Sequence, residues 1–163
     1  MKDQGTTVQD VEKVGAVEKV LLKILKADPR IILPQYESEG ASGMDLRAFL
    51  IDDITIPPLG REKIPTGLKL EIPSGYEAQV RPRSGLAIKT GLTVLNSPGT
   101  IDSDYRGDLE IILINLGAEN VTIKDGDRIA QLVIAPVCHA LLEESNSLSV
   151  SQRGSAGFGS TGV

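Results

Sequence analysis

Apolar and polar residues alternate in short runs along most of the chain, and Gly or Pro interrupts these runs at near-regular intervals. The clearest example is residues 68–72, LKLEI, which have the two-residue period of a strand with one face in a core. Turn signals recur roughly every 8–12 residues, a spacing typical of a sandwich, a jelly roll or a closed barrel. Only residues 84–92, SGLAIKTGL, have a helical pattern, long enough for one or two turns. The pattern therefore predicts an all-β domain.

The two ends of the chain depart from this alternation. Residues 1–16 are polar and weakly patterned, which is typical of a short helix or a mobile arm. A strand-like run begins at Lys19, and the apolar pattern stops after Leu148. We therefore expect a mobile extension over residues 1–16, one domain over residues 17–148 and a flexible arm over residues 149–163. Phe158, one of only two Phe residues, lies in this arm without apolar neighbours.

Composition narrows the classes of function. The formal net charge is −5 and the sequence pI is about 4.9, so no nucleic-acid partner is expected. A few well-placed Arg residues can still bind an anionic substrate. No apolar run reaches the roughly 20 residues of a membrane span, and no secretory signal is visible, so we expect no membrane association and a cytoplasmic location.

The chain has one Cys and one His, which cannot form a Cys/His zinc site. Cys138 and His139 both lie in the apolar run VIAPVCHALL, where they are predicted to be packing residues of a strand. Nothing marks His139 as a catalytic base. If the protein is an enzyme, carboxylates and Arg residues must do the chemistry.

Five stretches have unusual polar density: ASGMDLRA, RPRSGLA, LNSPGTIDSDYRGDLEI, GDRIAQLVI and the tail RGSAGFGSTGV. A Gly-rich loop with Arg and Ser can bind phosphate, but each stretch alone is more often an ordinary turn. In this order and at these spacings they resemble the five motifs of the homotrimeric dUTP diphosphatase (dUTPase) family, from Val17 to the C-terminus. The resemblance implies a compact jelly-roll-like β barrel, a homotrimer with composite active sites, Mg²⁺, and hydrolysis of dUTP to dUMP and pyrophosphate. This reaction limits uracil in DNA and supplies dUMP for thymidylate synthesis.

The third motif would supply the catalytic base and the uracil pocket. By resemblance, Asn96 pairs with the uracil edge, and Asp102 orients and deprotonates the attacking water. Tyr105 would pack under the deoxyribose and leave no room for a 2′-hydroxyl. Main-chain contacts would come from Thr100, Ile101 and Glu110. The alternative is an ordinary Asp-rich hairpin with Tyr105 in a core.

Phosphate contacts would come from the other motifs. The resemblance assigns Arg83, Ser84 and Gly85 to the α/β region of the triphosphate and the Gln131 amide to a phosphate oxygen. Asp45 would hold Mg²⁺ through its water shell, or alternatively cap backbone N–H groups. Arg128 is expected to form a structural ion pair instead.

The tail is the fifth motif. Arg153 would meet the γ-phosphate, and Phe158 would stack on uracil while the arm closes over a site built by the other two subunits. Further N–H and hydroxyl donors would be Gly157, Gly159, Ser160 and Thr161. The sequence departs from the family pattern at Met44, where many relatives carry Tyr, and at Ala156, where Gly is commoner.

Two alternatives remain at this stage. The related dCTP deaminases share the fold, but their catalytic Glu would fall near Ile112, and Ile cannot transfer a proton. A non-catalytic trimeric binding or regulatory module is disfavoured because Asp102 and the complete tail are both present.

Overall fold

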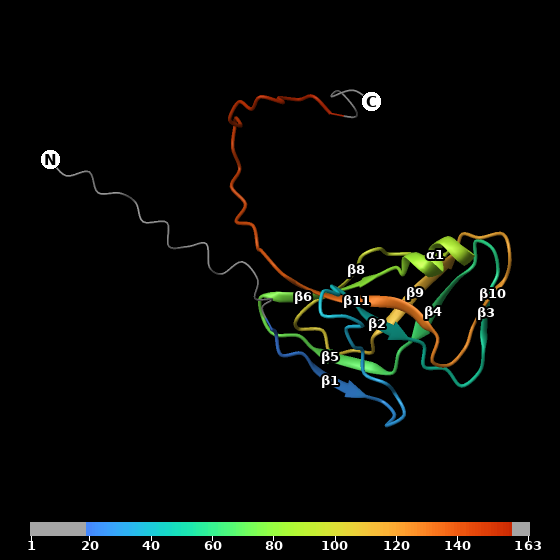
Figure 1. Cartoon of the computed structure of the whole chain (residues 1–163). Coiled ribbons are helices and arrows are strands. Elements are labelled where there is room, and N and C mark those ends of the chain that lie inside the picture. Colours follow the sequence, from blue (N-terminus) through green and yellow to red (C-terminus); the bar gives the residue numbers. More distant parts are fainter. Residues whose placement is uncertain (1–18, 158–163) are drawn as a thin grey trace.

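The computed structural model describes residues 19–157, which form strands and one short helix (Figure 1). Every pairing between these strands is antiparallel. The elements are β1 (Lys23–Lys26), β2 (Met44–Arg47), β3 (Ile54–Ile56), β4 (Arg61–Pro65), β5 (Leu68–Glu71), β6 (Tyr76–Arg81), α1 (Ser84–Thr90), β7 (Leu92–Val94), β8 (Gly99–Ile101), β9 (Glu110–Asn115), β10 (Val121–Ile123) and β11 (Arg128–Pro136).

The strands form four small sheets. The largest has the order β2-β11-β6-β8, and a three-stranded sheet has the order β4-β9-β7. The pairs β1–β5 and β3–β10 complete the body, below and to the right of these sheets in Figure 1. The predicted all-β, jelly-roll-like class is confirmed, although the sheets stay separate and the barrel is not closed.

The alternating pattern read from the sequence is the burial pattern of the strands. Leu68, Leu70 and Ile72 are almost fully buried, whereas Lys69 and Glu71 between them are not. The core is a single cluster of aliphatic side chains contributed by all four sheets. Its largest fully buried members are Leu46, Ile56, Ile64, Leu92, Ile111, Leu113, Ile129 and Leu132. Burial of this apolar surface is the main stabilising term for the domain.

Helix α1 lies where the sequence predicted a helical turn or two. Pro82 and Arg83 connect it to β6, and its C-cap is Gly91, whose N–H donates to the Ala87 carbonyl at 2.9 Å. None of its residues is buried. Within residues 19–157 no helix is long and apolar enough to span a bilayer.

Asn115, at the end of β9, is a fully buried polar side chain with every hydrogen-bonding function used. Its amide nitrogen donates to the carbonyls of Ile56 at 2.9 Å and Glu119 at 2.7 Å, and its side-chain oxygen accepts from the Gly117 N–H at 2.9 Å. It thereby ties the end of β3 to the loop that leads into β10.

Replacing Asn115 by Ala is expected to lower the free energy of unfolding by about 1–3 kcal/mol, because buried backbone groups lose their partners. Urea unfolding would measure this as a lower midpoint at an unchanged m-value. The exposed Asn120→Ala in the same loop is the matched control. Equal midpoints for the two variants would show that the Asn115 side chain is not needed for stability.

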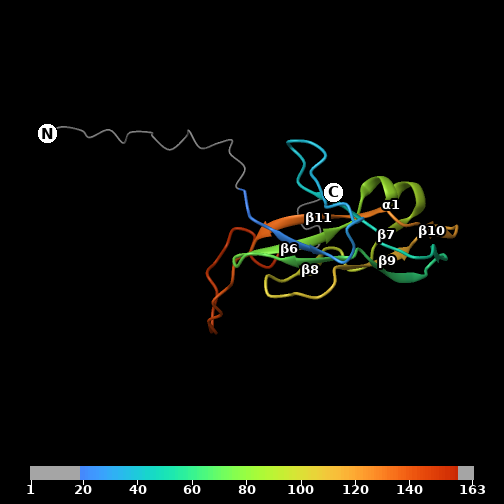
Figure 2. The ribbon, with the colours of Figure 1, turned by 90° about the horizontal axis from the view of Figure 1, so that it is seen from below.

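The segment that follows β11 is not a strand at Cys138 and His139. Cys138 and His139 are exposed and follow the end of the strand, so their prediction as packing residues of a strand is wrong. The last residue of β11, Pro136, is opposite Tyr76, the first residue of β6, and the Val137 N–H donates to the Gly75 carbonyl at 2.9 Å just beyond them. Residues 138 and 139 belong to no strand within the described part of the chain. Figures 1 and 2 show the segment after β11 running outside the sheets, and its Leu141 and Leu142 are fully or almost fully exposed.

Candidate active site

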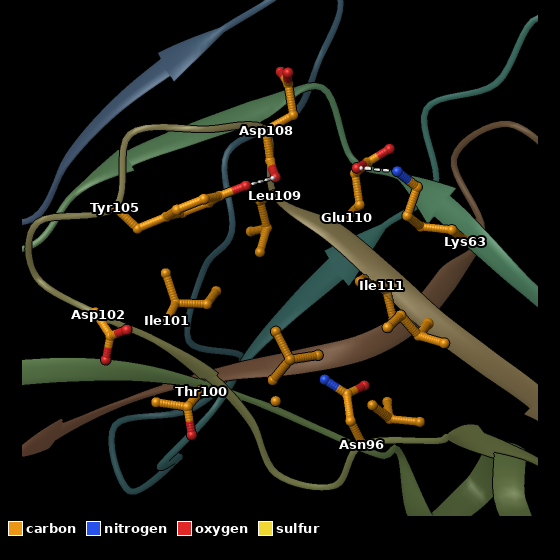
Figure 3. A pocket seen from close by; sticks show the side chains of 14 residues that line it. Lys63, Asn96, Thr100, Ile101, Asp102, Tyr105, Asp108, Leu109, Glu110 and Ile111 are labelled. Carbon is orange, nitrogen blue, oxygen red and sulfur yellow. Dashed lines mark hydrogen bonds and ion pairs between the residues drawn. The ribbon is translucent and has the colours of Figure 1, made fainter.

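A cavity of about 250 Å³ opens between β4, the β8–β9 hairpin and the loop before β8 (Figure 3). Six of the residues predicted from the third motif line it: Asn96, Thr100, Ile101, Asp102, Tyr105 and Glu110. Apolar side chains complete the walls, among them Val80, Val94, Leu109 and Ile111. A mostly apolar slot with a few placed polar groups is the usual form of a small-molecule site.

β8 lies between Asn96, which is three residues before the strand, and Asp102, which follows it directly. Gln79 of β6 pairs with Thr100 of β8, which fixes the strand on the four-stranded sheet. A Cβ at Gly99 would lie 3.2 Å from the Asn96 amide nitrogen and 3.3 Å from Val80, so glycine leaves room for the amide beside the sheet. Asp102 is the first residue after β8, and its carboxylate lies at the edge of the cavity in Figure 3.

Tyr105 forms a side wall of the cavity. Its ring is half exposed, and its hydroxyl donates to the Asp108 carbonyl at 3.2 Å. The turn is closed by the Tyr105 N–H, which donates to the Asp102 carbonyl at 3.2 Å. The alternative that placed Tyr105 in the core is therefore wrong, since the ring faces the cavity (Figure 3).

Lys63 is a pocket residue that the sequence analysis missed. Its ammonium lies 2.7 Å from the Glu110 carboxylate at the rim of the cavity (Figure 3). The hydrogen bond to Glu110 raises the pKa of Lys63 above its ordinary value. The pairing of β4 with β9 places Lys63 there, and no motif in the sequence marks it.

The residues predicted to bind phosphate form a second group, on β2, β11 and the start of α1. Asp45 accepts from Arg83 at 2.8 Å and from Arg128 at 3.1 Å, and Arg83 also donates to the Arg128 carbonyl at 3.0 Å. The predicted ion pair of Arg128 is confirmed. The partners of Asp45 in this arrangement are guanidinium groups, whereas the alternative from the sequence was a cap on backbone N–H groups.

The other phosphate candidates lie beside this ion-pair cluster. Gln131 is opposite Asp45 in the sheet, and its amide donates to the Pro82 carbonyl at 2.8 Å. Ser84 and Gly85 are exposed in the first turn of α1, directly after Arg83. None of these residues lines the hairpin cavity. A single chain therefore presents the nucleoside candidates and the phosphate candidates as two separate groups.

The tail candidates are only partly described. Arg153 is exposed, and its side chain donates to the Ala156 carbonyl at 2.8 Å; neither it nor Gly157 lines the cavity. Phe158, Gly159, Ser160 and Thr161 lie outside the described residues. Among residues 19–157, no group of three or more His, Cys, Asp or Glu side chains is arranged to hold a metal ion.

The fold and the cavity define an antiparallel β protein with a nucleoside-sized slot, a carboxylate at its edge and a separate group of arginines paired with Asp45. The family model for dUTPase matches residues 29–162. The chain belongs to the dUTPase family, a family of nucleotide hydrolases.

Two relatives with more than 50% sequence identity to this chain share one name. The deoxyuridine 5′-triphosphate nucleotidohydrolase of Bdellovibrio bacteriovorus is 58% identical over 147 residues, covering 90% of this chain and 99% of that protein. The protein of the same name from Wolinella succinogenes is 53% identical over 149 residues, covering 91% and 99%. Among solved structures, a mutant dUTPase of Staphylococcus bacteriophage 80alpha with dUpNHpp is 27% identical, with a TM-score of 0.79, covering 88% of this chain and 99% of that chain.

Proposed function

We propose that the chain hydrolyses dUTP to dUMP and pyrophosphate, with the nucleoside bound in the hairpin cavity. The observation that carries the proposal is that Asn96, Asp102 and Tyr105 line one cavity of about 250 Å³. The names of the relatives, at 53–61% identity, support the same substrate.

Asp102 is the proposed general base. A water at the edge of the cavity gives a proton to its carboxylate while the water oxygen attacks the α-phosphorus. The bond between the α-phosphorus and the α,β-bridging oxygen breaks, and pyrophosphate leaves with that oxygen. Asp102 suits the role because it follows β8 directly and is, of the carboxylates that line the cavity, the nearest in sequence to Asn96. The Glu110 carboxylate is instead paired with Lys63.

The residues that line the cavity would select uracil among the bases and deoxyribose over ribose. The Asn96 amide presents both a donor and an acceptor to the edge of uracil. We expect the main chain of the β8–β9 hairpin to border the bound base, so that a 5-methyl group is excluded by overlap. Tyr105, held by the Asp108 carbonyl, would pack on the deoxyribose where a 2′-hydroxyl would otherwise sit.

We propose that three subunits complete each site. The separation of the hairpin cavity from Arg83, Ser84 and Gln131 in one chain supports this, because a bound triphosphate needs both groups. Exposed apolar side chains such as Leu95, Ile112 and Leu116 near β7 and β9 also favour burial against another subunit. The C-terminal arm of a third subunit would bring Arg153 and Phe158 over the ligand.

Mg²⁺ is proposed as part of the substrate complex. The described residues offer no resident metal site, and both oxygens of Asp45 already accept from arginines. Mg²⁺ commonly reaches nucleotide enzymes on the substrate phosphates with most of its waters retained. Asp45 would then meet only the water shell of an ion that the triphosphate brings.

The proposal is tested by pyrophosphate release from dUTP, with dCTP and UTP as parallel substrates and ammonia assayed in each reaction. We expect pyrophosphate from dUTP, little from the other two nucleotides, and no ammonia. Ammonia from dCTP would instead indicate a deaminase. Binding of dUTP without turnover would indicate a non-catalytic module.

Removing the tail before Arg153 is expected to abolish most of the catalytic efficiency while the protein stays folded and oligomeric. The lost contacts are a charge-assisted bond to phosphate, worth roughly 1.5–3 kcal/mol, and a stacking contact on uracil, worth about 1–3 kcal/mol. Binding of dUMP should suffer less than binding of a non-hydrolysable dUTP analogue. Sedimentation and thermal melting provide the controls. Dissociation or a large fall in melting temperature, with little change in activity per site, would show that the tail is structural.

A further inference from the structure

The turn between β4 and β5 is hydrogen-bonded to Leu109, the residue directly before β9. The Thr66 hydroxyl donates to the Leu109 carbonyl at 2.6 Å and accepts from the Leu68 N–H at 3.3 Å. The Thr66 N–H donates to the same carbonyl at 3.2 Å, and the Leu109 N–H donates to the Leu68 carbonyl at 2.8 Å. Thr66 is 1% exposed, so its hydroxyl has no water to replace these partners.

The turn cannot move away from β9, because it is packed on its other side. Gly67 has a φ of +67°, and a Cβ there would collide with Ile31 and press on the ring of Phe49. The positive φ is the conformation that glycine adopts without strain. The position of the Thr66 hydroxyl is therefore set by the body of the domain, and Leu109 is held against it.

The segment held in this way is a wall of the cavity. Asp108, Leu109 and Glu110 all line it, and the Asp108 carbonyl accepts from the Tyr105 hydroxyl (Figure 3). Two exposed ion pairs flank Leu109: Lys69 with Asp108 at 3.6 Å and Lys63 with Glu110 at 2.7 Å. Thr66 itself does not line the cavity.

We infer that Thr66 is a positioning residue for the nucleoside, which acts through Leu109 to set the width of the slot between β8 and the returning strand. The inference rests on the proposed function, because it assumes that this slot holds uracil. A buried hydroxyl that only stabilised the fold would have no reason to affect which pyrimidine binds. Its loss should therefore weaken nucleoside binding and base selectivity more than it slows the reaction of bound substrate.

The test compares Thr66→Val, which keeps the shape and removes the hydroxyl, with Thr66→Ser, which keeps the hydroxyl. For Thr66→Val we expect about 3–10-fold weaker dUMP binding and a similar fall in the ratio of catalytic efficiency for dUTP over dCTP, the effect of one hydrogen bond. The kcat at saturating dUTP should stay within about 3-fold of wild type, since Asp102 is untouched. Thr66→Ser should stay within about 2-fold in all three measurements.

If Thr66→Val lowers the melting temperature but matches Thr66→Ser in dUMP affinity and in the dUTP/dCTP ratio, the inference is wrong and Thr66 is purely structural. Wild-type protein is measured first, so failure to bind dUMP or hydrolyse dUTP would count against the proposed function before any variant is compared.

If Thr66→Val does not fold, a surface variant can test instead whether the position of residues 108–110 controls nucleoside binding. Lys69→Gln breaks the exposed pair with Asp108, and Lys23→Gln breaks the exposed pair with Glu71; neither lysine lines the cavity, so each change removes one positive charge without removing a residue of the cavity wall. Weaker dUMP binding for Lys69→Gln, by about 2-fold or more relative to Lys23→Gln, would support the inference. Equal affinities in the two variants would overturn it.

Discussion

Replacing Asp102 by Asn is expected to lower the kcat for dUTP hydrolysis by about 10²–10⁴-fold, the contribution typical of general-base catalysis. The amide keeps the size of the side chain but cannot accept the proton of the attacking water. Affinity for dUMP should stay within a few-fold, because the proposed uracil contacts come from Asn96 and the hairpin backbone. The lone His139 is exposed beyond β11 and offers no evident replacement base.

Asp104→Asn is the matched control for this variant. Asp104 lies two residues further along the same loop, is exposed and does not line the hairpin cavity, so the change removes the same charge nearby without touching the proposed chemistry. Pre-steady-state and steady-state rates at saturating dUTP would separate chemistry from product release. Near wild-type turnover of Asp102→Asn would remove Asp102 from the mechanism.

The wild-type protein is expected to prefer dUTP over dCTP by about 10⁴–10⁵-fold in kcat/KM, because a site built to hydrogen-bond one edge leaves its polar groups unpaired with the wrong base. Asn96→Ala should reduce this preference by about 10–100-fold. The Asn96 amide points into the cavity in Figure 3, beside Gly99, where it can reach the edge of a bound base.

Asn120→Ala, exposed and outside the cavity lining, should leave the preference unchanged. Comparable efficiency of the wild-type protein on dCTP and dUTP would contradict the uracil pocket as a whole. An unchanged preference in Asn96→Ala would contradict only the role of this side chain and would leave the hairpin backbone as the source of selectivity.

Local features of the domain were predictable from the sequence because they depend on neighbouring residues. The alternation at residues 68–72 needs only the two-residue period of a strand, and its buried and exposed positions are as predicted. The short helix at Ser84–Thr90 followed from a local pattern as well. The hairpin residues Asn96, Asp102 and Tyr105 lie within ten positions of one another, so a motif could place them in one site before the fold was known.

Contacts between distant segments were decided by the tertiary structure alone. Asp45 contacts Arg83 and Arg128 because β11 pairs with β2 on one side and with β6 on the other. The register of these pairings cannot be predicted from any local sequence pattern. The end of β11 is set by the length of β6, so the apolar run through Cys138 and His139 gave the wrong prediction. Thr66 reaches Leu109 across 43 positions of sequence, and Lys63 reaches Glu110 through the pairing of β4 with β9. Side chains of ordinary type acquire these roles only when the sheets assemble, since each partner is specified by strand order and register and not by its neighbours in the chain.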